Sequence, residues 1–378
     1  MTALFACVAV VYVLGMAARM ALAARWFARS EPLSAAHAKV TVMIPVVSGD
    51  PALQACLRAN LDNAPDATFL LMVESDDGEA RRITADLARQ TCDVLVVPPP
   101  ATGENPKVAK LARALPHVAT PLFAVLDDDT VLPPGAISEA VAALGTEPAK
   151  GGDLVTGLPV YETDGGFFTR LLAAFVNGSV LITYPVGALL GEQRTLNGMF
   201  YLGRTDDLRG LGGFEAIRGD LTDDYAMARL YLDAGRLLVQ SRVVHPVRTT
   251  VTGFRHHVSV MRRWMIFARR YLRENPSPFT LGLIGGTTLA PLVLIGLACA
   301  TGGWALALVV VLLAAKAVVL RRMRSTLMGS HEDPSQVPLE MLADVLTPLH
   351  MATTVFRPSA MRWRNRQIRM VGERITYE

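Results

Sequence analysis

Apolar residues gather in two long blocks near the ends of the chain. The first block extends from Ala3 to Ala24 and is interrupted only by Arg19. Roughly 20 apolar residues are enough for one helix to cross a bilayer, so the block predicts an N-terminal transmembrane anchor within residues 1–28. A cleaved signal peptide is the alternative. It is disfavoured because no positive charge precedes the apolar core, whereas Arg25 and Arg29 follow it.

The second block runs from Phe279 to Leu320 and is about twice the length that one span needs. Gly302-Gly303 near its middle is a natural turn, so residues 279–320 predict a transmembrane hairpin. Positive charges favour the cytoplasmic side, and arginines follow both blocks. We therefore expect a multi-pass protein of the cell membrane whose central segment, about 25–278, faces the cytoplasm.

A weaker apolar segment, Met341 to Phe356, contains Asp344, Pro348 and His350. A further span would place the basic run MRWRNRQIR outside the cell, so residues 337–378 predict an interfacial or re-entrant helix followed by a basic C-terminal tail. An ordinary helix packed on the cytoplasmic domain is the alternative.

Short apolar runs alternate with helical patterns through residues 38–275, which predict one cytoplasmic domain. Strands are expected at 39–46, 69–73, 94–97 and 122–126, and helices after Asp50, Gly78 and Asn105. This alternation is typical of an α/β fold with a mostly parallel sheet flanked by helices. Ligands bind such sheets at the carboxyl ends of the strands.

Composition strengthens the membrane interpretation. Of the 378 residues 51% are hydrophobic and only 19% are charged, whereas a soluble domain has about 25% charged residues. The net charge of +3 is too small and dispersed to indicate nucleic acid. The four cysteines are scattered without metal-binding spacing, and no G-x-G-x-x-G or Walker loop is present.

Acidic clusters follow the expected strands and open a later helix: Glu74/Asp76/Asp77, Asp127/Asp128/Asp129 and Asp223/Asp224. A solvated turn would explain any single cluster. In an extended backbone Asp127 and Asp129 can converge on one hard cation, Mg²⁺ or Mn²⁺, that bridges them to a diphosphate. That cation would neutralise the charge growing on a leaving nucleoside diphosphate.

Two further positions carry candidate chemistry. One of Asp223 and Asp224 can cap the helix that they open, which leaves the other to act as a base. In the aromatic and basic stretch before the second block, Arg263 is a candidate to neutralise the diphosphate and Trp264 to form an apolar wall for the acceptor. The alternative is an interfacial helix that uses Arg and Trp as anchors.

The order of these motifs resembles membrane glycosyltransferases of family two with a GT-A fold, and most closely the branch of ceramide glucosyltransferases and hopanoid-associated glycosyltransferases. The resemblance spans about Val40 to Pro276. The matching segments are NPK at 105–107, LDDDT at 126–130, GLPV at 157–160, LNGMFYLGR at 196–204, LGGFE at 211–215, LTDDYAMA at 221–228 and the pair Arg263-Trp264.

The resemblance implies an inverting transfer of a sugar from a nucleotide sugar, UDP-glucose or a related UDP-hexose, to a hydroxyl of a membrane lipid such as ceramide. Asp224 would be the catalytic base. Donor binding would involve Glu74 or Asp76 with Lys107, Asp127 and Arg263, with the metal on Asp127 and Asp129. Acceptor binding would involve Gly198, Met199 and Trp264.

The chain departs from the branch at three points. Glu74 stands where the branch has its first acid, Val260 replaces the Gln or Arg of (Q/R)-x-x-R-W, and IPVVSGDP lacks the lysine of the ceramide enzymes. A hopanoid or other polyol lipid is therefore an alternative acceptor. A processive polysaccharide synthase and a membrane-anchored binding protein with a degenerate fold are alternative functions.

Overall fold

The computed structural model describes residues 1–28, 39–145, 153–329, 331–356, 360–363, 366–371 and 374–377. The chain divides into two compact units. Unit 1 comprises Met1–Ser30, Val160–Glu192 and Val251–Pro358, and unit 2 comprises Glu31–Pro159, Gln193–Thr250 and Ser359–Glu378. Segments 160–192 and 251–275, which we expected in the cytoplasmic domain, thus belong to the same unit as the long apolar helices.

Unit 2 is built on a seven-stranded sheet in the order β3-β2-β1-β4-β6-β5-β7. The pairs β2–β3, β1–β2 and β1–β4 are parallel, whereas β6 runs antiparallel to both β4 and β5. The strands are β1 (Val40–Pro45), β2 (Thr68–Glu74), β3 (Cys92–Val97), β4 (Leu122–Leu126), β5 (Leu154–Tyr161), β6 (Phe200–Arg204) and β7 (Leu238–Val247). The predicted α/β class with a mostly parallel sheet is confirmed.

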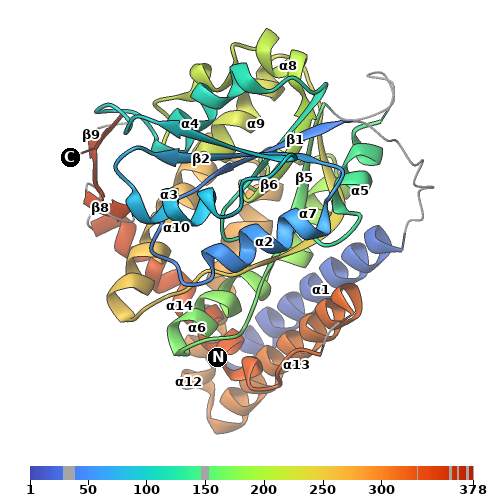
Figure 1. Ribbon diagram of the computed structural model, residues 1–378. Helices are drawn as coiled ribbons and strands as arrows, with labels where there is room; N and C mark the ends of the chain where they lie inside the picture. The colour runs from blue at the N-terminus through green and yellow to red at the C-terminus, as the bar shows by residue number, and fades with distance from the viewer. Residues whose placement is uncertain are drawn as a thin grey trace. The chain divides into compact units, whose positions relative to one another are not determined.

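Helices cover both faces of this sheet, as the buried central strands require. They are α2 (Leu53–Asn63), α3 (Gly78–Ala85), α4 (Pro106–Ala114), α5 (Ala136–Leu144), α8 (Thr205–Gly210) and α9 (Asp223–Asp233), with 3₁₀ turns at Leu115–His117 and Gly213–Ile217. Successive residues of β1 face opposite sides. Val42 and Ile44 pack with α2, α3 and α5, whereas Met43 packs with α4 and α9 (Figure 1).

Two helix starts in unit 2 can be compared with the starts that the sequence predicts. Asn105 caps α4 as expected, since its side chain accepts from the Lys107 and Val108 amides and Pro106 follows it. The expected start of α2, with Asp50 as the N-cap, is wrong by two residues, because Ala52 is the N-cap and Leu53 is the first helical residue. Asp50 instead binds the backbone amides of Ala52 at 2.9 Å and Thr250 at 2.8 Å, so its carboxylate ties two loops together.

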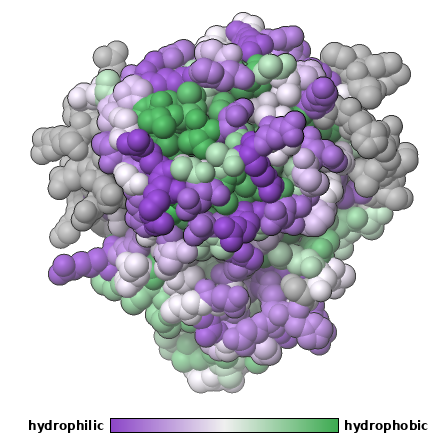
Figure 2. Space-filling model, in the orientation of Figure 1, coloured by the Kyte–Doolittle hydropathy of each residue, from purple (hydrophilic) through white to green (hydrophobic). Residues whose placement is uncertain are grey.

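Unit 1 consists of helices, several of them long. They are α1 (Thr2–Phe27), α6 (Phe167–Asn177), α7 (Val180–Leu189), α10 (Phe254–Glu274), α11 (Pro278–Thr280), α12 (Thr287–Thr301), α13 (Gly303–Met328) and α14 (Gln336–Phe356), with a π-helical turn at Leu281–Gly286. The expected turn of the hairpin is present, because Gly302 separates α12 from α13 with a φ of 127°. Figure 2 shows hydrophobic residues at the surface both above the centre and in the lower part of the view.

Four segments of the described chain are long and apolar enough to cross a membrane: Thr2–Phe27, Phe167–Leu189, Ile284–Thr301 and Gly303–Met328. We expected the first and the last two. The second comprises α6 and α7, which break at Gly178-Ser179, and 67% of its most apolar window is buried inside the protein. Its apolar character therefore serves packing between protein elements to a much greater extent than in the other three.

Charged residues on these helices are matched by polar partners. Arg19 on α1 donates to the carbonyl of Ile182 at 3.2 Å and to the hydroxyl of Thr183 at 3.0 Å, both on α7. Lys316 on α13 pairs with Asp344 on α14 at 2.6 Å. Such partners are needed because an unpaired charge at membrane depth costs several kcal/mol.

The expected C-terminal region forms helix α14 followed by a three-stranded antiparallel sheet. Its strands β8 (Ala360–Trp363), β9 (Arg366–Val371) and β10 (Arg374–Tyr377) pair in the order β10-β9-β8. The basic run MRWRNRQIR falls largely on β8 and β9. Arg29, which supported the expected orientation of the first helix, lies outside the described residues.

A buried ion cluster joins three parts of unit 1. Arg324 on α13 is 1% exposed and pairs with Glu332 at 2.7 Å and with Glu340 on α14. Its guanidinium also donates to the carbonyl of Asn177, the last residue of α6. The arginine therefore connects α13, α14 and the break between α6 and α7.

We expect Arg324→Met to destabilise the protein strongly, by about 3–5 kcal/mol, because it leaves two buried carboxylates without their cation. Thermal unfolding of the purified full-length protein in detergent would measure this. Arg322→Met is the matched control, since Arg322 is exposed two positions away on the same helix and its loss should cost under about 0.5 kcal/mol. Equal melting temperatures for the two variants would contradict the structural role of Arg324.

Candidate active site

Acidic residues meet at the carboxyl edge of the parallel strands. Glu74 is the last residue of β2, and Asp127, Asp128 and Asp129 directly follow β4. The chain after β1 reaches the same edge, because the Val47 amide donates to Asp128 at 2.8 Å. The sequence prediction that ligand chemistry gathers at strand ends is consistent with this arrangement.

Lys107 is the centre of the site. Its ammonium lies 2.7 Å from Asp127 and 2.9 Å from Asp223, and it donates to the Gly198 carbonyl at 2.8 Å. The contacts to the Gly198 carbonyl and to Asp127 are hydrogen bonds, whereas the contact to Asp223 is an ion pair without hydrogen-bond geometry. The four residues come from α4, the turn after β4, the chain before β6 and the start of α9. We call them, with Asp224, the Lys107 cluster.

Asp224 lies directly against Gly198. A Cβ atom added to Gly198 would meet the Asp224 Cβ at 3.0 Å and its Oδ2 at 3.4 Å. Only glycine allows this approach without moving the carboxylate. Asp224 is the second residue of α9, and its Oδ1 accepts from the Tyr225 amide at 2.7 Å.

Two members of the Lys107 cluster differ in how readily they exchange a proton. Burial, followed by the negative charge of Asp223, raises the pKa of the Asp224 carboxyl to about 7. Burial lowers the pKa of Lys107, but the carboxylates of Asp127 and Asp223 outweigh it and hold that pKa well above its usual value. The lysine is thus a fixed cation, whereas Asp224 can exchange a proton near neutral pH.

Sequence reasoning missed Lys110. This residue is 1% exposed, lies 3.2 Å from Glu74 and donates to the Val46 carbonyl at 2.7 Å. A signal was available, because Lys110 stands among the apolar positions of the helical pattern PKVAKLARA. The pair holds Glu74 at the strand edge, whereas Asp76, the alternative nucleoside-binding acid, is exposed.

The two aspartates expected to hold a metal have different neighbours. Asp127 faces Lys107, whereas Oδ2 of Asp129 accepts from the Thr249 hydroxyl at 2.6 Å. Within the described residues, no three His, Cys, Asp or Glu side chains form a group that could hold an ion. Mg²⁺ commonly binds through one or two carboxylates plus substrate phosphates, so the carboxylate donors present fit a metal that arrives with a diphosphate.

The remaining predicted residues are placed as follows. The Met199 carbonyl accepts from the Asp127 amide at 2.9 Å, which ties the chain before β6 to the turn after β4. Arg263 and Trp264 lie on α10 in unit 1. Trp264 stacks on Phe175 with ring centroids 5.8 Å apart. The donor and acceptor roles of these residues stay predictions.

Among solved structures, the chain resembles the mannosyltransferase PcManGT from Pyrobaculum calidifontis, which was solved in complex with GDP-Man and Mn2+. The identity is 16%, the match covers 91% of this chain and 99% of that one, and the TM-score is 0.50. A second match is glucosyl-3-phosphoglycerate synthase from Mycobacterium tuberculosis, in complex with Mg2+ and UDP. It has 18% identity, a TM-score of 0.38, and coverage of 66% of this chain and 85% of that one.

The sheet, its flanking helices and the first of these likenesses define a glycosyltransferase-type GT-A fold. The family model of Glycosyl transferase family 21 matches residues 1–375, and the chain belongs to that family. None of the curated proteins matches the chain. The motifs resemble those of family two, whereas the model that matches is that of family 21. The ceramide or hopanoid branch that the motifs resemble stays a prediction.

We expect Gly198→Ala to lower the rate of sugar transfer by at least tenfold with little change in melting temperature. The new methyl group would displace the Asp224 carboxylate by a few tenths of an ångström. Release of nucleoside diphosphate measures the rate. Gly219→Ala is the matched control, because its added Cβ meets nothing nearer than 3.7 Å. Similar rates in both variants would contradict the close-contact argument.

Proposed function

We propose that this protein is an inverting glycosyltransferase that moves a sugar from a nucleotide sugar, UDP-glucose or a related UDP-hexose, to a hydroxyl of a membrane lipid such as ceramide. Membership of glycosyl transferase family 21 supports the reaction type. The observation that carries the mechanism is the half-buried Asp224 carboxyl, with its pKa near 7, held against Gly198 beside a fixed cation.

Asp224 is the general base in this proposal. A carboxylate with a pKa near the working pH accepts a proton effectively without being fully protonated. It would take the proton of the acceptor hydroxyl, whose oxygen then attacks the anomeric carbon opposite the leaving nucleoside diphosphate. The bond to the diphosphate oxygen breaks as the new glycosidic bond forms, so the configuration inverts.

The donor would lie along the carboxyl edge of the sheet. Glu74 or Asp76 would orient the nucleoside, and Arg263 would neutralise the diphosphate. Lys107 contacts three protein oxygens, so we assign it to positioning Asp127, Asp223 and Gly198. Asp127 and Asp129 would hold Mg²⁺ or Mn²⁺, which would supply charge neutralisation at the leaving group. The mannosyltransferase PcManGT, whose fold this chain shares, was solved in complex with GDP-Man and Mn2+.

A lipid acceptor fits the long apolar helices of unit 1. Four segments are long and apolar enough to span a bilayer. A lipid acceptor does not leave the bilayer, so the transferase must work at its surface. We propose a multi-pass protein of the cell membrane with its catalytic domain in the cytoplasm, with Gly198, Met199 and Trp264 on the acceptor side. A hopanoid or other polyol lipid is the alternative acceptor, and a polysaccharide synthase the alternative enzyme.

Asp224→Asn should lower the transfer rate by about 10²–10⁴-fold, the usual contribution of a general base. Purified protein, manganese and a panel of UDP-sugars would be assayed for UDP release. Asp233→Asn is the control, since Asp233 is an exposed acid at the other end of the same helix. Equal release by the wild type and the Asp224 variant would remove Asp224 from the mechanism.

The rate should also depend on pH near neutrality. The base works as the carboxylate, and its pKa in the folded protein is raised to about 7. We therefore expect kcat/KM to fall about tenfold per pH unit below 7 and to level off above it. A profile that stays flat from pH 5.5 to 8 would contradict the assignment, provided that the melting temperature is constant over that range.

Acceptor and donor can be identified together. Membranes from cells with the wild-type chain or with Asp224→Asn would be incubated with radiolabelled UDP-sugars and then extracted. We expect a labelled lipid that depends on Asp224. Label in a water-soluble polymer would instead support the synthase, and no label in either fraction would contradict the UDP-sugar donor.

A further inference from the structure

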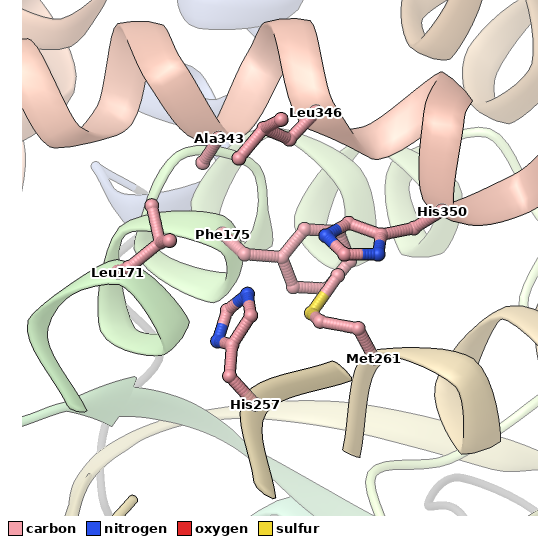
Figure 3. Close-up of a pocket in the computed structure, with 7 residues that line it drawn as sticks. All are labelled: Leu171, Phe175, His257, Met261, Ala343, Leu346 and His350. Carbon is pink, nitrogen blue, oxygen red and sulfur yellow. The ribbon is translucent and has the colours of Figure 1, made fainter. Parts of the chain in front are cut away.

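Within the part of the chain that the structure describes, buried polar groups without a hydrogen-bond partner occur in both units. In unit 1, the ring centroids of His257 and His350 lie 5.6 Å apart beside a small space among α6, α10 and α14 (Figure 3). That space measures about 10 Å³, close to the least that one water molecule needs, so it admits no ligand. In unit 2, one such group is the hydroxyl of Tyr201, the second residue of β6.

Tyr201 is completely buried, with 0% of its surface exposed. Its ring meets that of Phe123 edge-on, with centroids 6.4 Å apart. In the sheet it pairs with Val125 on β4, two residues before Asp127. Its hydroxyl has no hydrogen-bond partner among the described residues. A buried hydroxyl without a partner destabilises the fold, so its presence at this position needs an explanation.

The helices that cover Tyr201 lead to the Lys107 cluster. Tyr201 packs with side chains of α4 and α9, whereas its neighbours Phe200 and Leu202 pack on the opposite face of the sheet. Lys107 lies in the first turn of α4, and Asp223 is the first residue of α9. Tyr201 therefore lies on the same face of the sheet as the helix starts that carry the charges of the cluster.

The charges that act on the Tyr201 hydroxyl are those of the Lys107 cluster. Burial raises the pKa of this phenol well above its usual value, the charge of Lys107 opposes that rise, and the carboxylates add to it. The carboxylates are those of Asp223, Asp127 and Asp224, in that order of effect. The phenol thus keeps its proton at neutral pH and can donate one hydrogen bond.

Asp223 offers an acceptor for that bond. Its Oδ2 is buried and lies 2.9 Å from the Lys107 ammonium, but it makes no hydrogen bond to any residue that the structure describes. The negative charge of Asp223 acts on Asp224, the proposed base, which directly follows it in α9. One cluster therefore contains a hydroxyl proton and a carboxylate oxygen that are both buried and both unused, beside the group that is to take the acceptor's proton.

We propose that Tyr201 is a positioning residue of the active site, whose hydroxyl donates to Oδ2 of Asp223 when the sugar nucleotide is bound. This bond fixes the Asp223 carboxylate and, through it, the place and the electrostatic surroundings of Asp224. Hydrogen bonds that serve catalysis are often long or poorly aligned before the substrate binds and tighten in the complex. The inference rests on the proposed function, because it requires a donor bound at the Lys107 cluster.

Tyr201→Phe tests the proposal, because it removes the hydroxyl and keeps the ring. We expect kcat for UDP release to fall about tenfold, the contribution of one hydrogen bond to a charged group, while KM for the UDP-sugar stays within about twofold. The melting temperature should not fall, since the substitution removes a buried hydroxyl that has no partner among the described residues. A residue with only a structural role would instead lower the melting temperature and leave kcat unchanged.

Tyr231→Phe is the matched control. Tyr231 is also 0% exposed, packs in the same part of the core and has a hydroxyl without a partner among the described residues. Burial raises the pKa of its phenol, and the charges that act on it include those of Asp207, Asp153 and Arg236 but none from the Lys107 cluster. We expect an unchanged kcat. A wild-type kcat in Tyr201→Phe, or an equal loss in Tyr231→Phe, would overturn the proposal.

A structure of the full-length protein with UDP and Mn²⁺ provides a second measurement that needs no turnover. We expect the Tyr201 oxygen within about 3 Å of Oδ2 of Asp223, and a separation beyond about 3.5 Å would overturn the proposal. This bond without UDP release by the wild type would uphold the positioning role and contradict the proposed function. UDP release without this bond would do the reverse, and a protein that binds no UDP would contradict both.

Discussion

The candidate active site depends on one ammonium group at its centre. Lys107 binds Asp127, Asp223 and the Gly198 carbonyl, which come from three parts of the chain that lie far apart in the sequence. Without this cation, Asp127, Asp223 and Asp224 would repel one another in a region largely closed to solvent, where like charges interact strongly. Because Lys107 offsets the charge of Asp127 and Asp223, several carboxylates can lie together at the sheet edge. One carboxyl among them, that of Asp224, can still exchange a proton near neutral pH.

Unit 1 also pairs its charged side chains with groups of opposite charge. Arg324 satisfies Glu332, Glu340 and the end of α6, and Lys316 satisfies Asp344. Each cation lies where several helices meet, so electrostatics specify which helices are neighbours while apolar contacts supply most of the burial.

Much of the fold could be predicted from the sequence because its signals are local. The β-branched run at 40–44, the Asn105-Pro106 cap and the Gly302 turn each act within a few residues. The start of α2 could not be predicted in this way, because Asp50 binds Thr250, two hundred residues away in the sequence. Candidate acids were found at strand ends, but the role of Lys107 as their common partner and the Lys110–Glu74 pair depend on tertiary contacts that no spacing reveals.

The direction of β6 has a consequence for how the enzyme can change over evolution. Because β6 runs antiparallel to β4, the residues that precede it, Gly198 and Met199, reach the edge where the other strands end. Their distance from Asp127 is then set by the pairing of Leu126 with Phe200, not by the length of any loop. A change of length between β5 and β6 that leaves this pairing intact therefore leaves Gly198 and Met199 in place. A single insertion inside β6 would shift the register and turn its side chains to the opposite face.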